Sequence, residues 1–190
     1  NHIYNCLGWG GIWLDWMGQG SRLTRNLLHG NKQDLMFEMN HGPYLVDNNL
    51  LLSNKKVTKA SSSGAYVHNL WAASINTWPN STRVPPYFKP HRIVTIDRSK
   101  IDQNDDRYYN NLFVGGTGTA KLDEDDFTCT AVGNVYLDGA KPSKSDRDAI
   151  DAENFDPEIK LEQGADGWWL EMKVDPTWRA QVKRPLVTTE

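Results

Sequence analysis

The chain has 190 residues, which suits one domain, or one domain with a small appendage, and can bury a hydrophobic core. A net charge of −3, the lack of a dense basic cluster and the lack of any apolar run as long as a membrane helix exclude nucleic acid and membranes as expected partners. The two cysteines fit no disulfide framework or metal pattern, whereas eight tryptophans and seven tyrosines provide rings of the kind on which sugars stack.

Short hydrophobic segments that contain an asparagine recur along residues 1–140. They read NHIYN, RNLLHG, NNLLLS, HNLWAAS, NNLFVGG and GNVYLDG, with asparagines at positions 1, 26, 49, 69, 111 and 134. The spacing is 20 to 25 residues, apart from one interval of 42, and such a period is typical of solenoids. The leucine-rich-repeat signature is absent, and amphipathic helical periodicity is almost confined to residues 143–153. The pattern therefore predicts an all-β parallel β-helix of about six coils, in which stacked asparagine amides hydrogen-bond to one another.

The segment GIWLDWM, residues 11–17, alternates as a strand and places Asp15 between two tryptophans. Asp15 lies 11 residues before Asn26, and Glu38 lies 11 residues before Asn49. The two acidic side chains are therefore expected directly above one another on neighbouring coils, facing outward. The same register predicts that the inward-facing residues are Ile12, Leu14, Trp16, Leu35, Phe37 and Met39. It predicts that the outward-facing residues are Trp13, Asp15, Met17, Met36, Glu38 and Asn40.

Two stacked carboxyl groups are unusual in a sheet. Neighbouring strands lie roughly 4.8 Å apart, so both groups cannot ionise comfortably and one pKa should rise. A sequence with a purely structural role would avoid like charges in adjacent positions. A separation of about 5 to 5.5 Å is also what a retaining glycosidase needs between its nucleophile and its acid/base. Asp15 and Glu38 are therefore the candidate catalytic pair.

Four further residues are candidates for binding a sugar. Trp13 lies on the carboxylate side and is the better stacking platform, whereas Trp16 is expected in the core. Asn40 and His41 would hydrogen-bond a sugar hydroxyl or tune the acid, although a polar turn at the end of the strand is an equal interpretation. His91, in the long connection VPPYFKPH, is a candidate to reach over the pocket, because long loops often cover active sites.

The remaining segments are interpreted as structural. DQNDD at 102–106 has oxygen ligands at alternate positions, but Arg107 stands where an EF-hand needs glycine, so we interpret it as a solvated turn and expect no metal. Residues 141–157 are charged and predicted to form a surface excursion with at most one short helix. GWWLEMKV is predicted to be a strand and PLVTT a further one. Residues 141–190 are expected to pack on the solenoid formed by residues 1–140.

Long motifs of the chain carry a resemblance to a known family. The segment GIWLDWMGQGSRLTRNLLHGNKQDLMFEMNHGPYLVDNNLLLS resembles the catalytic region of glycoside hydrolase family 120, bacterial β-xylosidases built on a right-handed parallel β-helix. The resemblance continues through GAYVHNLWAASI, VPPYFKPH, DRYYNNLFVGG, DGAKPSK, FDPEIKL, ADGWWLEM and RPLVTTE, and so covers essentially the whole chain. It implies that Asp15 is the nucleophile and Glu38 the general acid/base.

The resemblance also implies a substrate and a missing part. The substrate would be a short β-1,4-linked xylo-oligosaccharide or an aryl β-xyloside, and no cofactor would be required. Proteins of the family are longer and begin with upstream coils that carry part of the sugar pocket. We therefore expect this chain to be a fragment, or to be completed by another polypeptide or a second copy. No segment reads as a signal peptide, and no compartment is predicted.

Two other functions remain open from the sequence. A polysaccharide lyase, also common on β-helices, would use a Lys or Arg base and often calcium, whereas these coils supply two acids and aromatic surface. A non-catalytic carbohydrate-binding or structural solenoid would show unperturbed carboxylates and no hydrolysis. Assays for reducing sugar from xylo-oligosaccharides and for unsaturated product from uronates distinguish the three.

Overall fold

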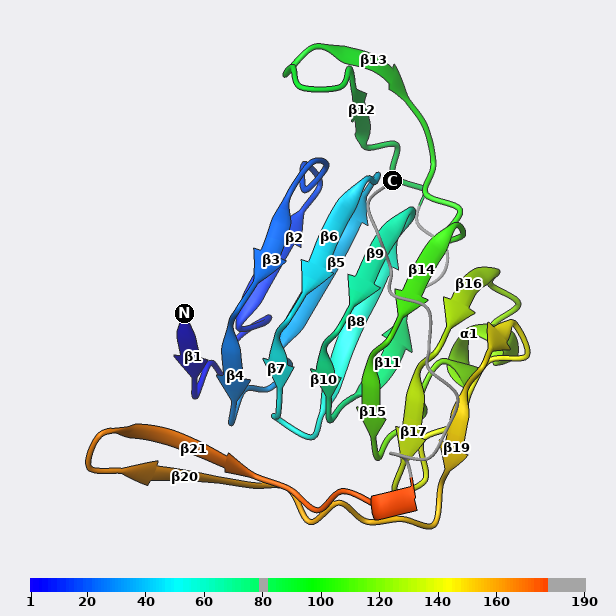
Figure 1. The fold of residues 1–190 in the computed structure, drawn as a ribbon. Coiled ribbons are helices and arrows are strands. Elements are labelled where there is room, and N and C mark those ends of the chain that lie inside the picture. Colours follow the sequence, from blue (N-terminus) through cyan, green and yellow to red (C-terminus); the bar gives the residue numbers. More distant parts are fainter. Residues whose placement is uncertain (79–81, 178–190) are drawn as a thin grey trace.

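The computed structural model describes residues 1–78 and 82–177, and these residues are mostly strands (Figure 1). Within this described part the only α-helix is α1 (Ala120–Glu124), and no helix is long and apolar enough to cross a membrane. Seventeen of the strands belong to three sheets whose neighbours all pair in parallel, and the other four form two antiparallel hairpins. The prediction of an all-β chain with parallel sheets is confirmed.

The three parallel sheets differ in size. The seven-stranded sheet contains, in spatial order, β1 (His2–Tyr4), β4 (Leu27–His29), β7 (Leu50–Leu51), β10 (Leu70–Trp71), β15 (Leu112–Val114), β17 (Val135–Leu137) and β19 (Ile150–Ala152). The four-stranded sheet contains β11 (Ser74–Thr77), β8 (Lys56–Ser61), β5 (Leu35–Asn40) and β2 (Ile12–Asp15). The six-stranded sheet contains β18 (Asp146–Arg147), β16 (Cys129–Val132), β14 (Asp106–Tyr109), β9 (Gly64–Val67), β6 (Tyr44–Asp47) and β3 (Arg22–Thr24).

The chain visits the three sheets in turn. β2, β3 and β4 belong to three different sheets, and so do β5, β6 and β7, and then β8, β9 and β10. Each new strand pairs in parallel with the corresponding strand of the preceding set, about 20 to 25 residues earlier in the chain. This order is consistent with a parallel β-helix, and we call each set of three strands, one from each sheet, a coil. The sequence period and the spatial repeat therefore have the same origin.

The recurring asparagines form a continuous hydrogen-bonded ladder. Each side-chain amide donates to the side-chain oxygen of the next asparagine. The donor–acceptor distances are 2.8 Å from Asn1 to Asn26, 2.8 Å from Asn26 to Asn49, 3.0 Å from Asn49 to Asn69, 3.0 Å from Asn69 to Asn111 and 2.9 Å from Asn111 to Asn134. The last asparagine donates to Asp146 at 2.8 Å. The predicted ladder is confirmed, and its 42-residue step joins neighbours like the others.

The corner that carries the ladder has a repeated backbone conformation. The residue before each later asparagine is left-handed, with φ values of 56° for Arg25, 55° for Asn48, 56° for His68, 52° for Asn110 and 72° for Gly133. Non-glycine residues rarely adopt such values without compensation from the surrounding structure. The buried hydrogen bonds between the side-chain amides of the ladder supply that compensation at each corner.

Replacing a central member of the ladder is expected to destabilise the chain. Asn69 is 1% exposed, and its amide accepts from Asn49 and donates to Val46 O and Asn111. Asn69→Ala leaves buried donors and acceptors unpaired, which should cost about 1–3 kcal/mol of unfolding free energy in urea titrations. The control Asn154→Ala removes an exposed asparagine and should change stability by less than about 0.5 kcal/mol. Equal losses in the two variants would contradict a structural role for the ladder.

The interior of the coils is lined with aromatic rings. Phe37 and Tyr44 stack with ring centroids 5.0 Å apart, and Tyr66 stacks on Tyr108 at 4.7 Å. Phe113 stacks on Tyr136, with ring centroids 5.1 Å apart. Rings at this spacing contribute beyond their buried area, and they hold successive coils in register.

An ion pair lies inside this interior, and it corrects one prediction. Asp106 is 1% exposed, and its Oδ2 lies 3.0 Å from Lys59 Nζ, which also donates to Ser61 O at 2.8 Å and Gln103 O at 2.9 Å. The prediction that segment 102–106 is a solvated turn is therefore wrong for Gln103 and Asp106, which are buried and bound by Lys59, although Asp102 and Asp105 are exposed. The carboxylate is accepted in the interior because a cation and a backbone N–H, that of Gly64 at 2.9 Å, bind it.

The long interval between Asn69 and Asn111 contains an insertion. It includes the antiparallel hairpin of β12 (Pro86–Phe88) and β13 (Thr95–Arg98), which projects beyond the ends of the parallel strands (Figure 1). Its exposed side chains include Ile93 and Ile96. The insertion adds chain without interrupting the ladder, which explains why two repeats' worth of sequence separates two adjacent coils.

The C-terminal part extends two of the parallel sheets and then leaves them. β18 and β19 lie within 141–157, where no helix forms, because the open edges of β16 and β17 provide parallel partners for this backbone. β20 (Lys160–Gly164) and β21 (Gly167–Glu171) form an antiparallel hairpin that runs along the lower edge of the coils towards β1 (Figure 1). Its Trp168 contacts His2 and His29, each at 4.9 Å between ring centroids. The segment PLVTT lies outside the described residues.

Candidate active site

The two candidate carboxylates come from adjacent strands of the four-stranded sheet. β2 and β5 pair in parallel, with Asp15 directly opposite Glu38. The alternate residues Ile12 and Leu14 pack against the core, as do Leu35 and Phe37 of β5. The acidic side chains therefore occupy the outer face of the sheet at the same level, and the predicted register is confirmed.

The alternation stops one residue beyond the pair. Trp16 and Met39 have left-handed backbones, with φ values of 48° and 53°, and the pairing register shifts after Glu38. The prediction that Trp16 belongs to the core is wrong, because this turn of the backbone directs its ring to the side of the carboxylates. There the Arg83 guanidinium lies 5.7 Å from the ring centroid. Met39 is buried, as are all six residues of β5, but it belongs to neither hydrophobic core cluster.

Glu38 is held in a partly buried ion pair that the sequence did not reveal. Its side chain is 9% exposed, and its Oε1 accepts a hydrogen bond from Arg83 Nη1. The Arg83 guanidinium lies between two indoles, those of Trp16 at 5.7 Å and Trp78 at 5.9 Å. Arg83 belongs to the insertion, 45 residues from Glu38, and no motif or spacing around it marks it as a site residue.

The surroundings of the acid pair change the pKa of Asp15. Its pKa is raised above the ordinary value of 3.8, first by desolvation and then by the charge of Glu38, whereas the Arg83 cation acts in the opposite direction. The exposed Asp15 and the buried Glu38 thus differ in accessibility although they share one level of the sheet. One pKa of the pair rises, as stacked carboxyl groups predict, and the raised pKa is that of Asp15, the expected nucleophile.

This shift has a consequence for stability. A raised pKa means that Asp15 destabilises the folded chain when ionised, so its contribution is favourable below pH 3.8 and is lost as the pH rises through the folded pKa. Asp15→Asn should therefore stabilise the chain at pH 7, by less than about 1 kcal/mol because solvent screens the exposed group. The gain should vanish in urea titrations below pH 3.8.

Asp47 provides a control of opposite sign. Hydrogen bonds from Arg22 lower the pKa of Asp47 to about 2, so its contribution to stability is present above pH 3.8 and is lost as the pH falls through about 2. Asp47→Asn should destabilise the chain at pH 7 by about 1 to 2 kcal/mol, less than the full pKa shift implies because solvent screens the exposed Arg22. Destabilisation by both substitutions at pH 7 would contradict the shift at Asp15.

Asn40 and His41 lie beside the pair but already have partners. Asn40 is fully buried, and its amide donates to Leu14 O at 2.6 Å while its oxygen accepts from the Gly18 N–H. It thus joins the ends of β2 and β5. The prediction that Asn40 faces outward is wrong, because the register shift after Glu38 leaves its side chain buried against the backbone of β2. His41 Nε2 lies 3.2 Å from Ser99 O, and its ring contacts that of Tyr87, so it lies against the insertion.

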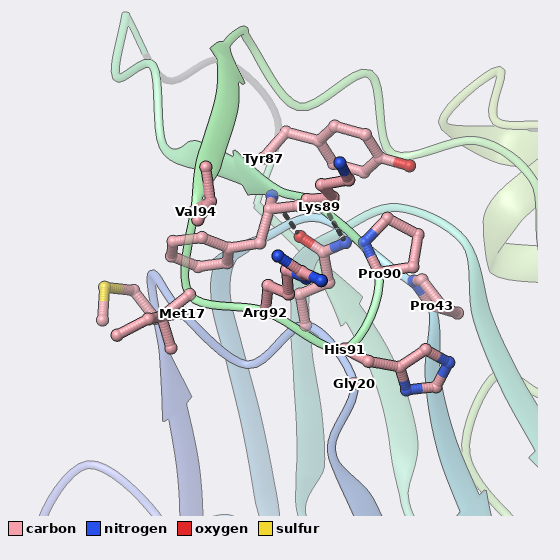
Figure 2. A pocket seen from close by; sticks show the side chains of 12 residues that line it. Met17, Gly20, Pro43, Tyr87, Lys89, Pro90, His91, Arg92 and Val94 are labelled. Atoms are coloured by element: carbon pink, nitrogen blue, oxygen red, sulfur yellow. Dashed lines mark hydrogen bonds between the residues drawn. The ribbon is translucent and has the colours of Figure 1, made fainter.

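Trp13 and His91 lie on opposite sides of the pair. Trp13 is on the outer face of β2, 43% exposed, with its ring centroid 6.3 Å from that of Trp9. His91 lines a cavity of about 1120 Å³ beneath the β12–β13 hairpin, together with Met17 and Pro43. Figure 2 shows its imidazole on the Pro43 side of this cavity, away from Met17. Neither acid lines the cavity, which begins just beyond the end of β2.

The Gln19 side chain helps to anchor the hairpin over this cavity. Gln19 donates to Phe88 O at 3.1 Å and accepts from Phe88 N at 2.8 Å, the two bonds drawn as dashed lines in Figure 2. A glutamine that bonds both backbone groups of one residue acts as an additional strand partner.

Within the described part of the chain, no three His, Cys, Asp or Glu side chains gather as metal ligands would.

The comparisons with known proteins show a similarity to a solved structure. No family model and no curated protein matches the chain. Among solved structures, the fold is similar to that of XylC in complex with xylose, with a TM-score of 0.87 and 28% sequence identity. The match covers 95% of this chain and 32% of XylC, so the chain spans about a third of that protein's length. Nearly all of the chain is therefore similar in fold to one part of XylC, a protein whose structure holds xylose, and the two are 28% identical in sequence.

Proposed function

We propose that the chain carries the catalytic part of a retaining glycoside hydrolase of family 120. Its described residues up to 140 form a right-handed parallel β-helix of about six coils, and residues 141–177 pack on it as an extension. The enzyme releases xylose from short β-1,4-xylo-oligosaccharides or aryl β-xylosides. The observation that carries the proposal is the in-register pair of Asp15 and Glu38 on an outer face, and the similarity to XylC supports xylose as the sugar.

The reaction proceeds in two steps and needs no cofactor. In the first, the Asp15 carboxylate attacks the anomeric carbon while protonated Glu38 donates its proton to the departing oxygen, leaving xylose as an ester of Asp15. In the second, the Glu38 carboxylate takes a proton from water, and the water oxygen displaces Asp15 from the anomeric carbon. Two inversions return xylose with its original configuration, and both carboxyl groups regain their starting states.

The surroundings of the two acids suit these roles. Asp15 is exposed, so a sugar can reach it, and the Arg83 cation offsets part of the rise in its pKa that desolvation and Glu38 cause. Glu38 is buried and oriented by Arg83, which places its second oxygen for proton transfer. We assign Arg83 as a positioning residue for both acids.

The four remaining candidates keep secondary roles in this proposal. Trp13 offers an exposed ring on the carboxylate face for stacking against a sugar. Asn40 positions the strand ends that carry the pair, because its amide bonds the backbone of both. His41 and His91 lie by the insertion, where they would contact a longer substrate.

One observation favours the alternative function of a polysaccharide lyase. Arg83 lies beside the acid pair, and arginine is a residue type that such enzymes use as a base. Its ion pair with Glu38 opposes that role, since a guanidinium held against a carboxylate does not give up its proton. A release of unsaturated uronate rather than xylose would select the lyase.

The rest of the sugar pocket belongs to the same proposal. Because the chain spans 32% of XylC, we propose that further walls of the pocket come from polypeptide beyond these residues or from a second copy. The isolated chain should then bind xylose weakly and turn over slowly or not at all. Rapid hydrolysis by the isolated chain would show that no further walls are needed.

A covalent label tests the function without requiring rapid turnover. A 2-deoxy-2-fluoro-β-xyloside with a good leaving group forms the ester with the nucleophile but hydrolyses slowly, so it should label one residue. We expect mass spectrometry of the digested protein to place the added sugar on the peptide that contains Asp15. The Asp15→Asn variant is the control and should remain unlabelled. A label on any other carboxylate would overturn the assignment.

A further inference from the structure

A second hollow lies on the outer face of the four-stranded sheet, on the opposite side of the acid pair from the cavity under the hairpin. Its volume is about 300 Å³. Its floor comes from three neighbouring strands, with Met36 on β5, Thr58 on β8 and Asn76 on β11. Its walls include the indoles of Trp9 and Trp78. We call this hollow the sheet groove.

The sheet groove begins close to the carboxylates. Met36 precedes Glu38 by two residues on the same face, and Thr58 likewise precedes Ala60, the neighbour of Glu38. Two residues of a strand span about 6.6 Å, which is roughly the length of one sugar ring. Trp78 links the two places, because its ring lies 5.9 Å from the Arg83 guanidinium. A sugar in the groove would thus be next to one held at the acid pair.

The floor of the groove presents a polar group suited to a sugar. Gln33 is 4% exposed, and its oxygen accepts from Thr58 Oγ1 at 2.6 Å. Its amide nitrogen lies 3.4 Å from the Met36 sulfur. A thioether is a weak acceptor, so this nitrogen can donate to a stronger one, such as a sugar oxygen.

The charge of the groove is of one sign. Lys32 and Lys56 line it, and none of the described residues that line it is acidic. Both lysines are exposed, and Lys32 Nζ lies 6.0 Å from the centre of the Trp9 ring. A chain of net charge −3 has therefore placed two cations and two indoles in one groove beside its acid pair. A neutral sugar would use the indoles and the amide but not the two cations.

We propose that the sheet groove binds a uronic acid residue of the substrate, whose carboxylate is recognised by Lys32 and Lys56. This inference rests on the proposed function, and it makes xylo-oligosaccharides with an acidic branch or end the preferred substrates. The ring stacks on an indole, a hydroxyl accepts from Gln33, and the xylose next to the acid lies at Asp15 and Glu38. The groove is made by residues of this chain, so its binding can be measured on the chain itself.

The test compares two ligands that differ only in the acid. Xylotriose and xylotriose with a glucuronic acid branch are titrated into the chain by NMR at low salt. We expect the acidic ligand to bind about 3- to 30-fold more tightly, the range for one or two exposed ion pairs. This preference should largely disappear at 1 M NaCl, where the Debye length is about 3 Å.

Variants separate charge recognition from structural effects. In the double variant Lys32→Ala, Lys56→Ala, the two ligands should bind equally, with the affinity for xylotriose unchanged. Lys55→Ala removes a neighbouring exposed lysine that does not line the groove and should keep the preference. Equal binding of both ligands to the unmodified chain, or loss of both in the double variant, overturns the inference but leaves the proposed function. Binding of neither ligand to the unmodified chain also overturns the inference, whereas the proposed function is overturned separately, by a covalent label on a carboxylate other than Asp15.

Discussion

Replacing Glu38 with alanine is expected to reduce hydrolysis of xylo-oligosaccharides by about 10²–10⁴-fold in the assembly that completes the pocket, because the leaving oxygen loses its proton donor. The loss should be much smaller for an aryl β-xyloside with a good leaving group, which departs without protonation. Added azide should then accelerate the second step, since it needs no base, and should give β-xylosyl azide with retained configuration. The measurement is release of the phenol, with NMR assignment of the product anomer.

Replacing Asp15 with alanine should have a different outcome. Without the nucleophile the covalent intermediate cannot form, so activity should be lost with every leaving group in the retaining pathway. Azide should occupy the space of the missing carboxylate and yield, if anything, the α-azide. The matched comparison of the two alanine variants therefore assigns the roles. A β-azide from Asp15→Ala, with no rescue of Glu38→Ala, would require the assignments to be exchanged.

Breaking the buried ion pair of Lys59 and Asp106 is expected to have the second large effect, a loss of stability. Lys59→Met leaves the Asp106 carboxylate in the core without its cation, since both side chains are at most 2% exposed. Breaking such a pair by removing one partner costs about 3–5 kcal/mol of unfolding free energy. Urea denaturation at pH 7 should show this loss, or the variant should not fold at all.

A second variant keeps this prediction testable if the first does not fold. Combining Lys59→Met with Asp106→Asn removes the uncompensated charge while the amide can still accept from the Gly64 N–H, so part of the stability should return. The control Lys55→Met changes an exposed lysine and should cost less than about 0.5 kcal/mol. A loss below about 1 kcal/mol for Lys59→Met would mean that the pair does not hold the core together.

The pair also connects the core to the candidate site. Lys59 donates to Gln103 O, and Gln103 donates to Trp78 O, so both ends of the insertion are tied to β8. The insertion carries Arg83, which bonds Glu38. Loss of Lys59 should therefore also disturb the position of Arg83. The bonds of the Lys59 ammonium go to Ser61, Gln103 and Asp106, so this effect on the site is indirect.

The sequence by itself determined the repeat and the level of the two acids. Each coil pairs with the next, so a residue's height is set by its distance from the ladder asparagine of its own coil, which is a local count. For Asp15 and Glu38 that count is the same, and their strands pair accordingly. The alternation of Ile12 and Leu14 with outward residues is likewise a property of one strand.

Only the tertiary structure decided the surroundings of those acids. Arg83 reaches Glu38 from an insertion whose path depends on contacts far apart in the sequence, so no spacing predicts it. Trp16 leaves the core because its left-handed backbone breaks the two-residue alternation on which the prediction relied. Asp106 is buried because Lys59, 47 residues earlier, meets it inside the coils, whereas its neighbours in the sequence indicated a solvated turn. Local periodicity thus places residues along a strand, and long-range ion pairs and turns decide which charges meet there.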